Sequence, residues 1–564
     1  MTADNSAKNA ARTPTAIDAI AEEWVTTLAD LDPDVAIWIG IPGRISQYGD
    51  FSPAGHAHLI DEGKKVMAKL SSQDPVDDID WVTKADMMDS LTLQSEEYDA
   101  GLFKRDLNVI ASPAQRLRDV LDLMPHDSVE DWATISGKLS NLPGAMDGYI
   151  ETLRQGIADG TTPARRQVTE VLEQAKRHMA KDGFFFAFTD SATTGDGAQL
   201  PDSLKSDLRK GAEASAEAYK QLADFFVNEL SPAASETDAI GRELYALNSR
   251  GFLGAKIDLD ETYEWGIEEL ARMVEEQTKI AGEIKPGASV DEAIAVLDAD
   301  PSRKIYGTDA LQKWMQNLSD NAIAELSKSH FDIPDPIRKL ECMIAPTQEG
   351  GIYYTGPSDD FSRAGRMWWS VPKGITEFDT WRETTTVYHE GVPGHHLQIA
   401  QGVYNSAELN TWRRQLSGTS GHAEGWALYA ERLMEELGYL NDPGDRLGML
   451  DGQRMRAARV VLDIGVHLGK QRLDGQGVWD YDYAYNFMKS NVNMNEPFVR
   501  FEVNRYFGWP GKAPSYKVGQ RIWEEIRDEA KAREGAAFNI KEFHRKALDL
   551  GGVGLDTLKA AMQK

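Results

Sequence analysis

The chain contains one cysteine in 564 residues and no apolar run that approaches the roughly 18 residues needed to cross a bilayer. A lone Cys342 excludes an internal disulfide, and the first twenty residues lack the apolar stretch of a secretory signal. These absences are typical of a protein kept in a reducing compartment. We therefore expect a cytoplasmic protein with no membrane partner.

Positive charge is also scarce, with 61 Lys and Arg residues against 90 Asp and Glu residues, a formal net charge of −29. A surface of this sign repels polyanions, and the chain has no tract in which arginines alternate with aromatic residues. We therefore expect no nucleic-acid partner. The apolar fraction of 41% is that of a globular protein. The sequence does not decide between a monomer and a homodimer.

Helical periodicity dominates the chain. It predicts helices at 203–230, 259–283, 381–401, 421–437, 447–473, 478–490, 514–533 and 540–549. Short β-strands fit only Ile352–Tyr354 and Arg366–Val371, in a patch rich in glycine, proline and aromatic residues. The prediction is a mainly α fold with a small sheet beside the candidate site.

Neither an internal repeat nor a low-complexity linker divides the chain. We therefore expect one continuous fold without independent domains. It would begin with a flexible tail at residues 1–14, followed by a helical N-terminal half at 15–340. The remaining half, at 341–564, would carry the functional site.

Three of the eleven histidines lie in one short stretch, the sequence HEGVPGHH that begins at His389. In the H-E-x-x-H zinc motif the second histidine follows the first by four residues, and the glutamate acts on the metal's water. Here Pro393 occupies that position, and the histidines come six and seven residues after His389. Either the helix is distorted so that a later histidine returns to the metal, or the stretch is a helix end with surface histidines.

The density of histidine favours the metal, because five of the eleven lie between positions 389 and 467. On a regular helix His396 shares the face of His389, but it lies about 10 Å further along the axis, which is awkward for two ligands of one ion. Pro393 removes a backbone donor and Gly394 tolerates unusual dihedral angles, so a bulge there would bring His395 back. We favour His395 as the second ligand and keep His396 as the alternative. If it is not a ligand, His396 would hydrogen-bond the substrate.

A third ligand is expected from the segment SGHAEGWALYAERLMEELG, which fits a helix. Glu424 lies there among apolar neighbours, where an unpaired carboxylate is costly without a cation. Glu431, two turns later on the same face, would instead support a ligand by hydrogen bonding. His422 fits either a substrate contact or a structural cap. The alternative to a metal-site role is, for each of these acids, that of an ordinary surface residue.

The pairing of HEGVPGHHLQ with GHAEGWALYAERL resembles the bacterial domain-of-unknown-function 885 family. Further segments of the family pattern are DLDPDVAIWIG, YGDFSPAG, NLPGAMDGYIETLRQGIADGTTPARRQV, LDIGVHLG and RYFGWPGKAPSYKVGQ, so the resemblance covers about residues 20–555. More distantly, the chain resembles the gluzincin metallopeptidases, such as carboxypeptidase Taq and the thimet-type oligopeptidases. The resemblance implies a helical, two-lobed body with a deep central groove, and it implies peptidase chemistry only by relation.

The family's tyrosine-rich strand is here Met367-Trp368-Trp369, which leaves the substrate preference open and makes Trp369 a candidate substrate contact. Peptide hydrolysis also needs a hydrogen-bond donor for the oxyanion and a group that holds a substrate end. Tyr516 and His467 are the candidate donors, and Arg505 offers its planar fork to a carboxylate. The alternatives are core packing and, for Arg505, an ion pair with Glu502. An extended peptide would add to an edge strand around residues 366–370.

The leading hypothesis is a zinc-dependent hydrolase, a metallopeptidase of carboxypeptidase or oligopeptidase type that cleaves short peptides or small amides. One zinc ion, or another divalent metal, would be held by His389, His395 and Glu424, with Glu390 as the general base on its water. One alternative keeps the metal and hydrolyses or lyses another C–N bond in a small metabolite. The other is a catalytically silent scaffold that binds metal structurally.

Overall fold

The computed structural model describes residues 12–345 and 351–564. It is 68% helical, so the predicted mainly α fold with small sheets is confirmed. The predicted N-terminal tail falls outside the described residues up to position 11. Arg12, near its end, forms ion pairs with Asp18 and Asp80. Among the described residues, no helix is both long and apolar enough to span a bilayer.

Helices fill the first part of the chain as far as residue 329. They are α1 (Ala16–Leu31), α2 (Pro33–Ile39), α3 (Pro53–Ser71), α4 (Asp78–Asp99), α5 (Pro113–Asp119), α6 (Val129–Asp159), α7 (Arg165–Met179), α8 (Phe184–Asp190), α9 (Asp202–Phe225), α10 (Ser231–Ala233), α11 (Arg242–Leu253), α12 (Leu259–Ile284), α13 (Val290–Asp298) and α14 (Thr308–Ser329).

A second series of helices follows the strands. They are α15 (Thr380–Glu390), α16 (His395–Tyr404), α17 (Ser420–Glu436), α18 (Pro443–His467), α19 (Tyr481–Asn491), α20 (Glu496–Gly508), α21 (Ser515–Glu534), α22 (Ile540–Asp549) and α23 (Leu555–Gln563). The single helix predicted at 381–401 is interrupted between α15 and α16. The other predicted helices of this part each have a counterpart within a few residues of their expected ends.

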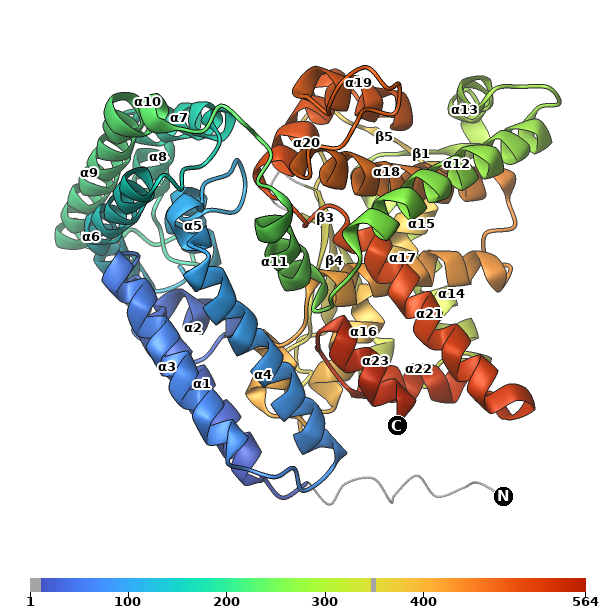
Figure 1. Ribbon diagram of the computed structural model, residues 1–564, viewed down its shortest axis with the longest axis horizontal. Helices are drawn as coiled ribbons and strands as arrows, with labels where there is room; N and C mark the ends of the chain where they lie inside the picture. Colours follow the sequence, from blue (N-terminus) through green and yellow to red (C-terminus); the bar gives the residue numbers. More distant parts are fainter. Residues whose placement is uncertain (1–11, 346–350) are drawn as a thin grey trace.

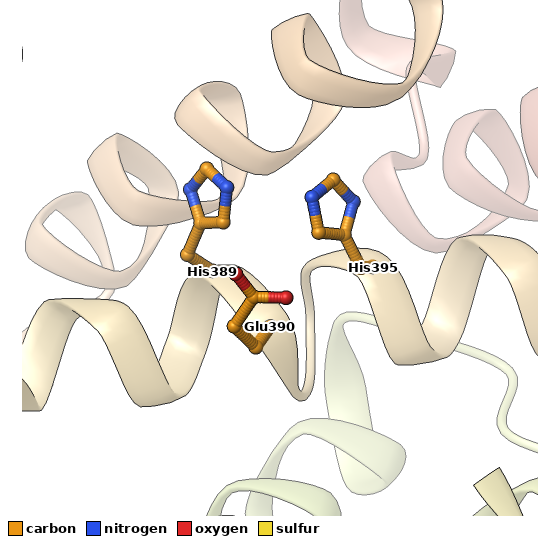
Figure 2. A group of neighbouring side chains, drawn as sticks. All are labelled: His389, Glu390 and His395. Carbon is orange, nitrogen blue, oxygen red and sulfur yellow. The ribbon is translucent and has the colours of Figure 1, made fainter. Parts of the chain in front are cut away.

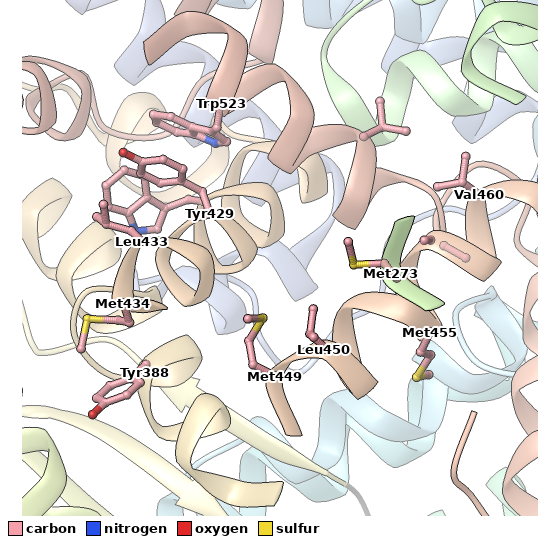
Figure 3. Packing of buried hydrophobic residues seen from close by; sticks show 14 of the residues in the cluster. Met273, Tyr388, Tyr429, Leu433, Met434, Met449, Leu450, Met455, Val460 and Trp523 are labelled. Carbon is pink, nitrogen blue, oxygen red and sulfur yellow. The ribbon is translucent and has the colours of Figure 1, made fainter. Parts of the chain in front are cut away.

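Two large groups of helices lie side by side in Figure 1, α1–α10 in blue to green and α11–α23 in green to red. The first group has a core between α6 and α9, where Ile135, Leu139 and Leu142 of α6 are fully buried. The second group has the larger core, around α12, α15, α17, α18 and α21. Figure 3 shows part of it, with Met273 of α12, Tyr429 of α17 and Leu450 of α18. Each fully buried large apolar side chain of this kind stabilises the fold by about 1.5–3 kcal/mol.

The helices of the second core cross at glycines, which lets their backbones touch. A Cβ atom at Gly425 of α17 would lie 2.4 Å from the carbonyl carbon of Gly519 of α21, and one at Gly448 of α18 would lie 2.0 Å from the carbonyl oxygen of Trp381 of α15. A side chain at either crossing would push the helices apart. The contact at Gly425 brings the beginnings of α17 and α21 together, and the contact at Gly448 holds α18 against the beginning of α15. The candidate site is built from residues of α15, α16, α17 and α21.

Two small sheets accompany the helices. Strand β4 (Gly365–Trp369) pairs in parallel with β2 (Leu340–Ile344) and antiparallel with β3 (Ile352–Thr355), while β1 (Lys304–Tyr306) pairs with β5 (Glu377–Asp379). Because β4 is the central strand, the predicted edge around residues 366–370 is wrong. On the other side of β2, the side chains of Gln312 and Gln316 hydrogen-bond its backbone. The other edge strand of this sheet is β3.

Candidate metal centre

The site begins where α15 ends. The helix stops at Glu390, the segment 391–394 turns, and α16 starts at His395. The amide of Gly394 donates to the carbonyl of Tyr388 at 3.0 Å, which spans a wider turn than the regular helical bond. A Cβ atom at Gly394 would lie 1.8 Å from the carbonyl oxygen of His389, so only glycine fits there. The indole of the fully buried Trp426 donates to the carbonyl of Pro393 at 2.8 Å and holds the turn against α17.

This interruption brings two imidazoles together. The ring centroids of His389 and His395 are 4.8 Å apart and nearly perpendicular. Figure 2 shows both rings rising on the same side of the chain with Glu390 between them. Ligand atoms of these three side chains lie within 4.8 Å of one another. His395 therefore reaches His389, six residues earlier in the chain, because the helix ends between them. The sequence had indicated a bulge inside one continuous helix.

Glu424 completes the arrangement from α17. Its Oε2 atom lies 3.4 Å from Nε2 of His389 and 3.6 Å from Nε2 of His395. Four atoms bound tetrahedrally at about 2.1 Å from one ion lie about 3.4 Å apart. The distances from Glu424 to the two imidazoles therefore match those between neighbouring ligands of a tetrahedral zinc ion. Glu390 is also close to both rings, but the matched distances to Glu424 make Glu424 the better third ligand.

Glu431 orients one of the rings. Its Oε1 atom lies 2.7 Å from Nδ1 of His389, and Thr385 donates to its other oxygen at 2.9 Å. With Nδ1 engaged in this way, His389 presents Nε2 toward Glu424. A carboxylate behind an imidazole is the usual support of a metal-bound histidine, because it fixes the tautomer and raises the basicity of the ligand.

The charges of the histidines and the glutamates in the centre affect one another. Burial alone would lower the pKa of His389, but hydrogen bonds to Glu424 and Glu431 outweigh it and raise the pKa to about 10. Burial would raise the pKa of Glu424, yet the two imidazoles hold it well below its usual range. The imidazole and carboxylate atoms that share protons here are the atoms that would bind a cation. Metal binding would therefore compete with protons and release them.

Glu390 is the residue with the most unusual environment. Its side chain is 7% exposed, and its carboxylate makes no hydrogen bond or ion pair with the residues at 12–345 and 351–564. Neither carboxylate oxygen is among the fully buried polar atoms that lack a partner, so the acid reaches open space beside the two imidazoles. An acid in this position is available to a water molecule or a ligand.

Tyr516 and Arg505 both come near the centre. Tyr516 lies in the first turn of α21, and burial followed by the charge of Glu424 raises the pKa of its phenol to about 12. The phenol therefore stays protonated at neutral pH and is available as a donor. Arg505 donates to Glu502 at 3.1 Å and lies 5.7 Å from the ring of Trp509. Its ion pair with Glu502 already satisfies part of its donor capacity.

Three further cations surround Tyr516, and the sequence had not singled them out. Lys512 lies 4.8 Å from the Tyr516 ring, and burial lowers the pKa of its amine to about 8. Arg459 lies 5.3 Å from the same ring and pairs with Glu502 at 2.7 Å. The charge of Arg456 acts on both Tyr516 and Glu431.

Arg456 is the cation that is left without a partner. Its Nε atom is buried, and no residue in the described part of the chain forms a hydrogen bond or ion pair with its guanidinium. In a chain with far more acids than bases, an unpaired arginine beside a carboxylate-rich centre is free to meet an anion from solution.

His396 and His422 do not join the centre. Both ring nitrogens of His396 are engaged elsewhere, Nε2 with the carbonyl of Ile337 at 2.7 Å and Nδ1 with the hydroxyl of Tyr354 at 2.9 Å. His422 packs 5.4 Å from the ring of Trp523, and burial lowers its pKa to about 4. Both histidines therefore have structural positions, and the substrate contacts predicted for them do not fit their surroundings.

His467 and Trp369 are also placed away from any substrate. His467 is fully buried, with Nε2 at 2.9 Å from the carbonyl of Tyr506, and burial lowers its pKa to about 4. Trp369 is 4% exposed and faces the main core, because alternate residues of β4 point inward. Its neighbour Trp368 points to the other face and donates to Thr355 at 2.9 Å. The predicted oxyanion role of His467 and the predicted substrate contact of Trp369 are therefore not supported.

We expect the replacement Glu431→Gln to weaken zinc binding by about 10–100-fold, the usual effect of removing the carboxylate behind a metal-bound histidine. The amide keeps the shape of the side chain but fixes His389 less firmly. Zinc affinity measured by competition with a chromophoric chelator would show the loss. Glu435→Gln, one turn later on α17, is the control, because Glu435 pairs with Arg432 and should leave the affinity unchanged.

Comparison with known proteins places the chain in a defined family. The family model described as "Bacterial protein of unknown function (DUF885)" matches residues 33–562. The match covers most of the chain, and the protein therefore belongs to this family. None of the curated proteins compared with the chain matches it.

Two solved structures share the fold. One is described as a "putative lipoprotein" from Colwellia psychrerythraea, with a TM-score of 0.81 and 22% identity over 98% of this chain and 99% of that one. The other is described as a "putative lipoprotein of unknown function" from Shewanella oneidensis, with a TM-score of 0.76 and 17% identity over 98% of this chain and 100% of that one. At these identities the likeness shows the fold alone.

The prediction of a cytoplasmic location is wrong on this comparison, because both solved structures are described as lipoproteins, a class anchored at a membrane surface. The prediction had relied on the single cysteine and on the lack of long apolar stretches, including in the first twenty residues. A chain with one cysteine has no internal disulfide to form in either an oxidising or a reducing compartment. The cysteine count therefore does not distinguish the two.

Proposed function

We propose that the protein is a zinc-dependent metallopeptidase that cleaves short peptides. The observation that carries the proposal is the position of the buried, unpaired Glu390 beside His389, His395 and Glu424, whose nearest atoms have the spacing of a tetrahedral zinc site. The third ligand from a following helix supports the more distant resemblance to the gluzincin peptidases. When bound, zinc would act as a Lewis acid on a water and on the substrate carbonyl.

The chain's own residues supply the rest of the chemistry. Glu390 would take the proton of the attacking water and pass it to the leaving amine, a role that requires a carboxylate free of protein partners. Tyr516, protonated at neutral pH, would donate a hydrogen bond to the oxygen that gains negative charge. Glu431 would keep His389 in position throughout.

The surroundings of Tyr516 favour a substrate with a free carboxylate. Arg456 has no partner in the described part of the chain, and Lys512 hydrogen-bonds only the hydroxyl of Ser420. A guanidinium that is not already paired binds a carboxylate through two parallel hydrogen bonds. We therefore assign Arg456 the role of anchor for the C-terminal end of a short peptide, and the edge strand β3 the role of holding its backbone.

Removal and return of the metal tests the proposal. We expect the purified protein to hold about one zinc per chain, to lose peptide hydrolysis on treatment with a chelator, and to regain it with zinc. The substrates are a panel of dipeptides to hexapeptides, each with a free or an amidated C-terminus. Hydrolysis should be faster with the free carboxylate. If the protein binds zinc and cleaves no peptide, the proposal fails in favour of a metabolite substrate or a metal-binding scaffold.

A further inference from the structure

A second recess lies at the junction of the two groups of helices. It is a cavity of about 440 Å³ whose wall combines α3, α4 and the residues after α4 with the loop that follows α20. Its volume falls within the roughly 300–1,000 Å³ of small-molecule sites. None of the metal-centre side chains lines it, so any conclusion about this cavity is independent of the proposed function.

The cavity contains charged groups of both signs without ion-pair partners. Glu97, Arg105 and Asp106 all line it, and none of them forms an ion pair with a residue in the described ranges. Burial raises the pKa of Glu97 and of Asp106 to about 7. The side chain of Asp106 is exposed, and those of Glu97 and Arg105 are half-buried, so a ligand in the cavity can reach all three. Groups of this kind without a protein partner are free to form charge-assisted hydrogen bonds with a ligand.

The cavity offers charges of both signs to one ligand. Burial lowers the pKa of Arg105, whose guanidinium has no ion-pair partner in the described ranges. The cation that acts on Asp106 is Arg116, which does not line the cavity. A ligand that carries one positive and one negative group would meet Arg105 and the two unpaired carboxyl groups together.

The rest of the wall is partly aromatic. Tyr98 and Phe103 stack with ring centroids 4.9 Å apart, and Trp509 contributes from the loop after α20. Aromatic faces accept both apolar side chains and organic cations. Gln167, 1% exposed, lines the cavity too, and its side-chain oxygen has no hydrogen-bond partner among the described residues. This oxygen is a second acceptor for a donor group such as an ammonium.

We propose that this cavity binds a zwitterionic amino acid or short peptide, with Glu97 and Asp106 meeting the ammonium group and Arg105 meeting the carboxylate. The aromatic side chains then cover the ligand's apolar part. Phosphorylated or purely anionic ligands fit poorly, because three acidic residues, Glu97, Asp106 and Asp238, line the cavity together with one arginine.

Calorimetric titration of the full-length protein with three forms of one dipeptide tests the assignment. The probes are alanyl-phenylalanine, its N-acetylated form, which lacks the ammonium, and its C-terminal amide, which lacks the carboxylate. All titrations use the Glu390→Gln background, which prevents consumption of the probe. We expect the zwitterion to bind at least tenfold more tightly than either blocked form, since each loses one charge-assisted contact.

Two variants and two matched controls locate the binding. Arg105→Gln should weaken the zwitterion and the acetylated form at least tenfold and leave the amide unchanged, whereas Glu97→Gln should weaken the zwitterion and the amide. Lys104→Gln and Glu96→Gln remove the neighbouring charges, which pair with Asp159 and Arg250 outside the cavity, and should change nothing. Thermal unfolding confirms that each variant is folded, and Arg105→Lys replaces Arg105→Gln if the latter is not.

Equal affinities in the variants and their controls would place the dipeptide elsewhere and overturn the assignment, as would the lack of saturable binding at millimolar concentrations. Neither result touches the proposed function, which depends on zinc content and turnover of the parent protein. Conversely, a protein without hydrolytic activity would still show the pattern of affinities expected here.

Discussion

The replacement Glu390→Gln is expected to lower peptide turnover by about 10²–10⁴-fold, the range that general acid–base catalysis contributes. The amide keeps the size of the side chain but has no basic oxygen that can take a proton from water. Because Glu424 holds the third corner of the candidate site, the variant should keep its zinc. Single-turnover hydrolysis and metal analysis on the same sample measure the two properties together.

Glu383→Gln is the matched control for this prediction. Glu383 lies on the same helix two turns earlier, and burial raises the pKa of its carboxyl to about 7, so it too is a recessed acid. It does not belong to the group formed by His389, Glu390 and His395. Turnover should be unchanged in the control. If Glu390→Gln retains full turnover, Glu390 has no part in the mechanism; if it loses zinc as well, Glu390 is a ligand.

Most of the helical fold was predictable from the sequence, because it depends on local periodicity and on apolar faces. Residues 259–283, for example, form α12 at Leu259–Ile284, as their spacing indicates. Pro393 and Gly394 indicated a distortion of the helix between His389 and His395, but the sequence did not indicate that one helix ends there and a second begins. This interruption is held by a contact from another helix, the indole of Trp426 on the carbonyl of Pro393, and no local pattern reports such a contact.

Some residues of the candidate site could likewise be predicted from local sequence patterns, and others could not. His389 and Glu424 could be found because a histidine–glutamate pair and a carboxylate among apolar neighbours are local signals. Arg456 could not, since the sequence does not tell which of the basic residues near the centre lack an ion-pair partner among the described residues. Trp368 and Trp369 show a related limit. Both fit a half-buried strand, and only the pairing of β4 decides which of the two faces the core.

The central test of the site is the pair of adjacent histidines. We expect His395→Ala to weaken zinc binding by more than the about 100-fold that loss of an outer carboxylate causes, because it removes a ligand itself. His396→Ala should keep the zinc affinity, since both nitrogens of His396 are bonded away from the centre. The two variants differ by one position in the chain, so general effects of altering this segment cancel.

We expect His396→Ala to destabilise the fold more than His395→Ala, the reverse of their order of effect on zinc binding. His396→Ala leaves the carbonyl of Ile337 and the hydroxyl of Tyr354 without their partner, and a buried polar group left unsatisfied costs about 1–3 kcal/mol. His395 is more exposed, and its Nδ1 has no partner among the described residues, so its loss should destabilise the zinc-free protein less. Chemical denaturation of both variants without metal, followed by zinc titration, measures the two effects separately. The assignment of His395 would be wrong if His396→Ala lost zinc while His395→Ala retained it. That result would show that the interruption of the helix places His396, and not His395, on the metal.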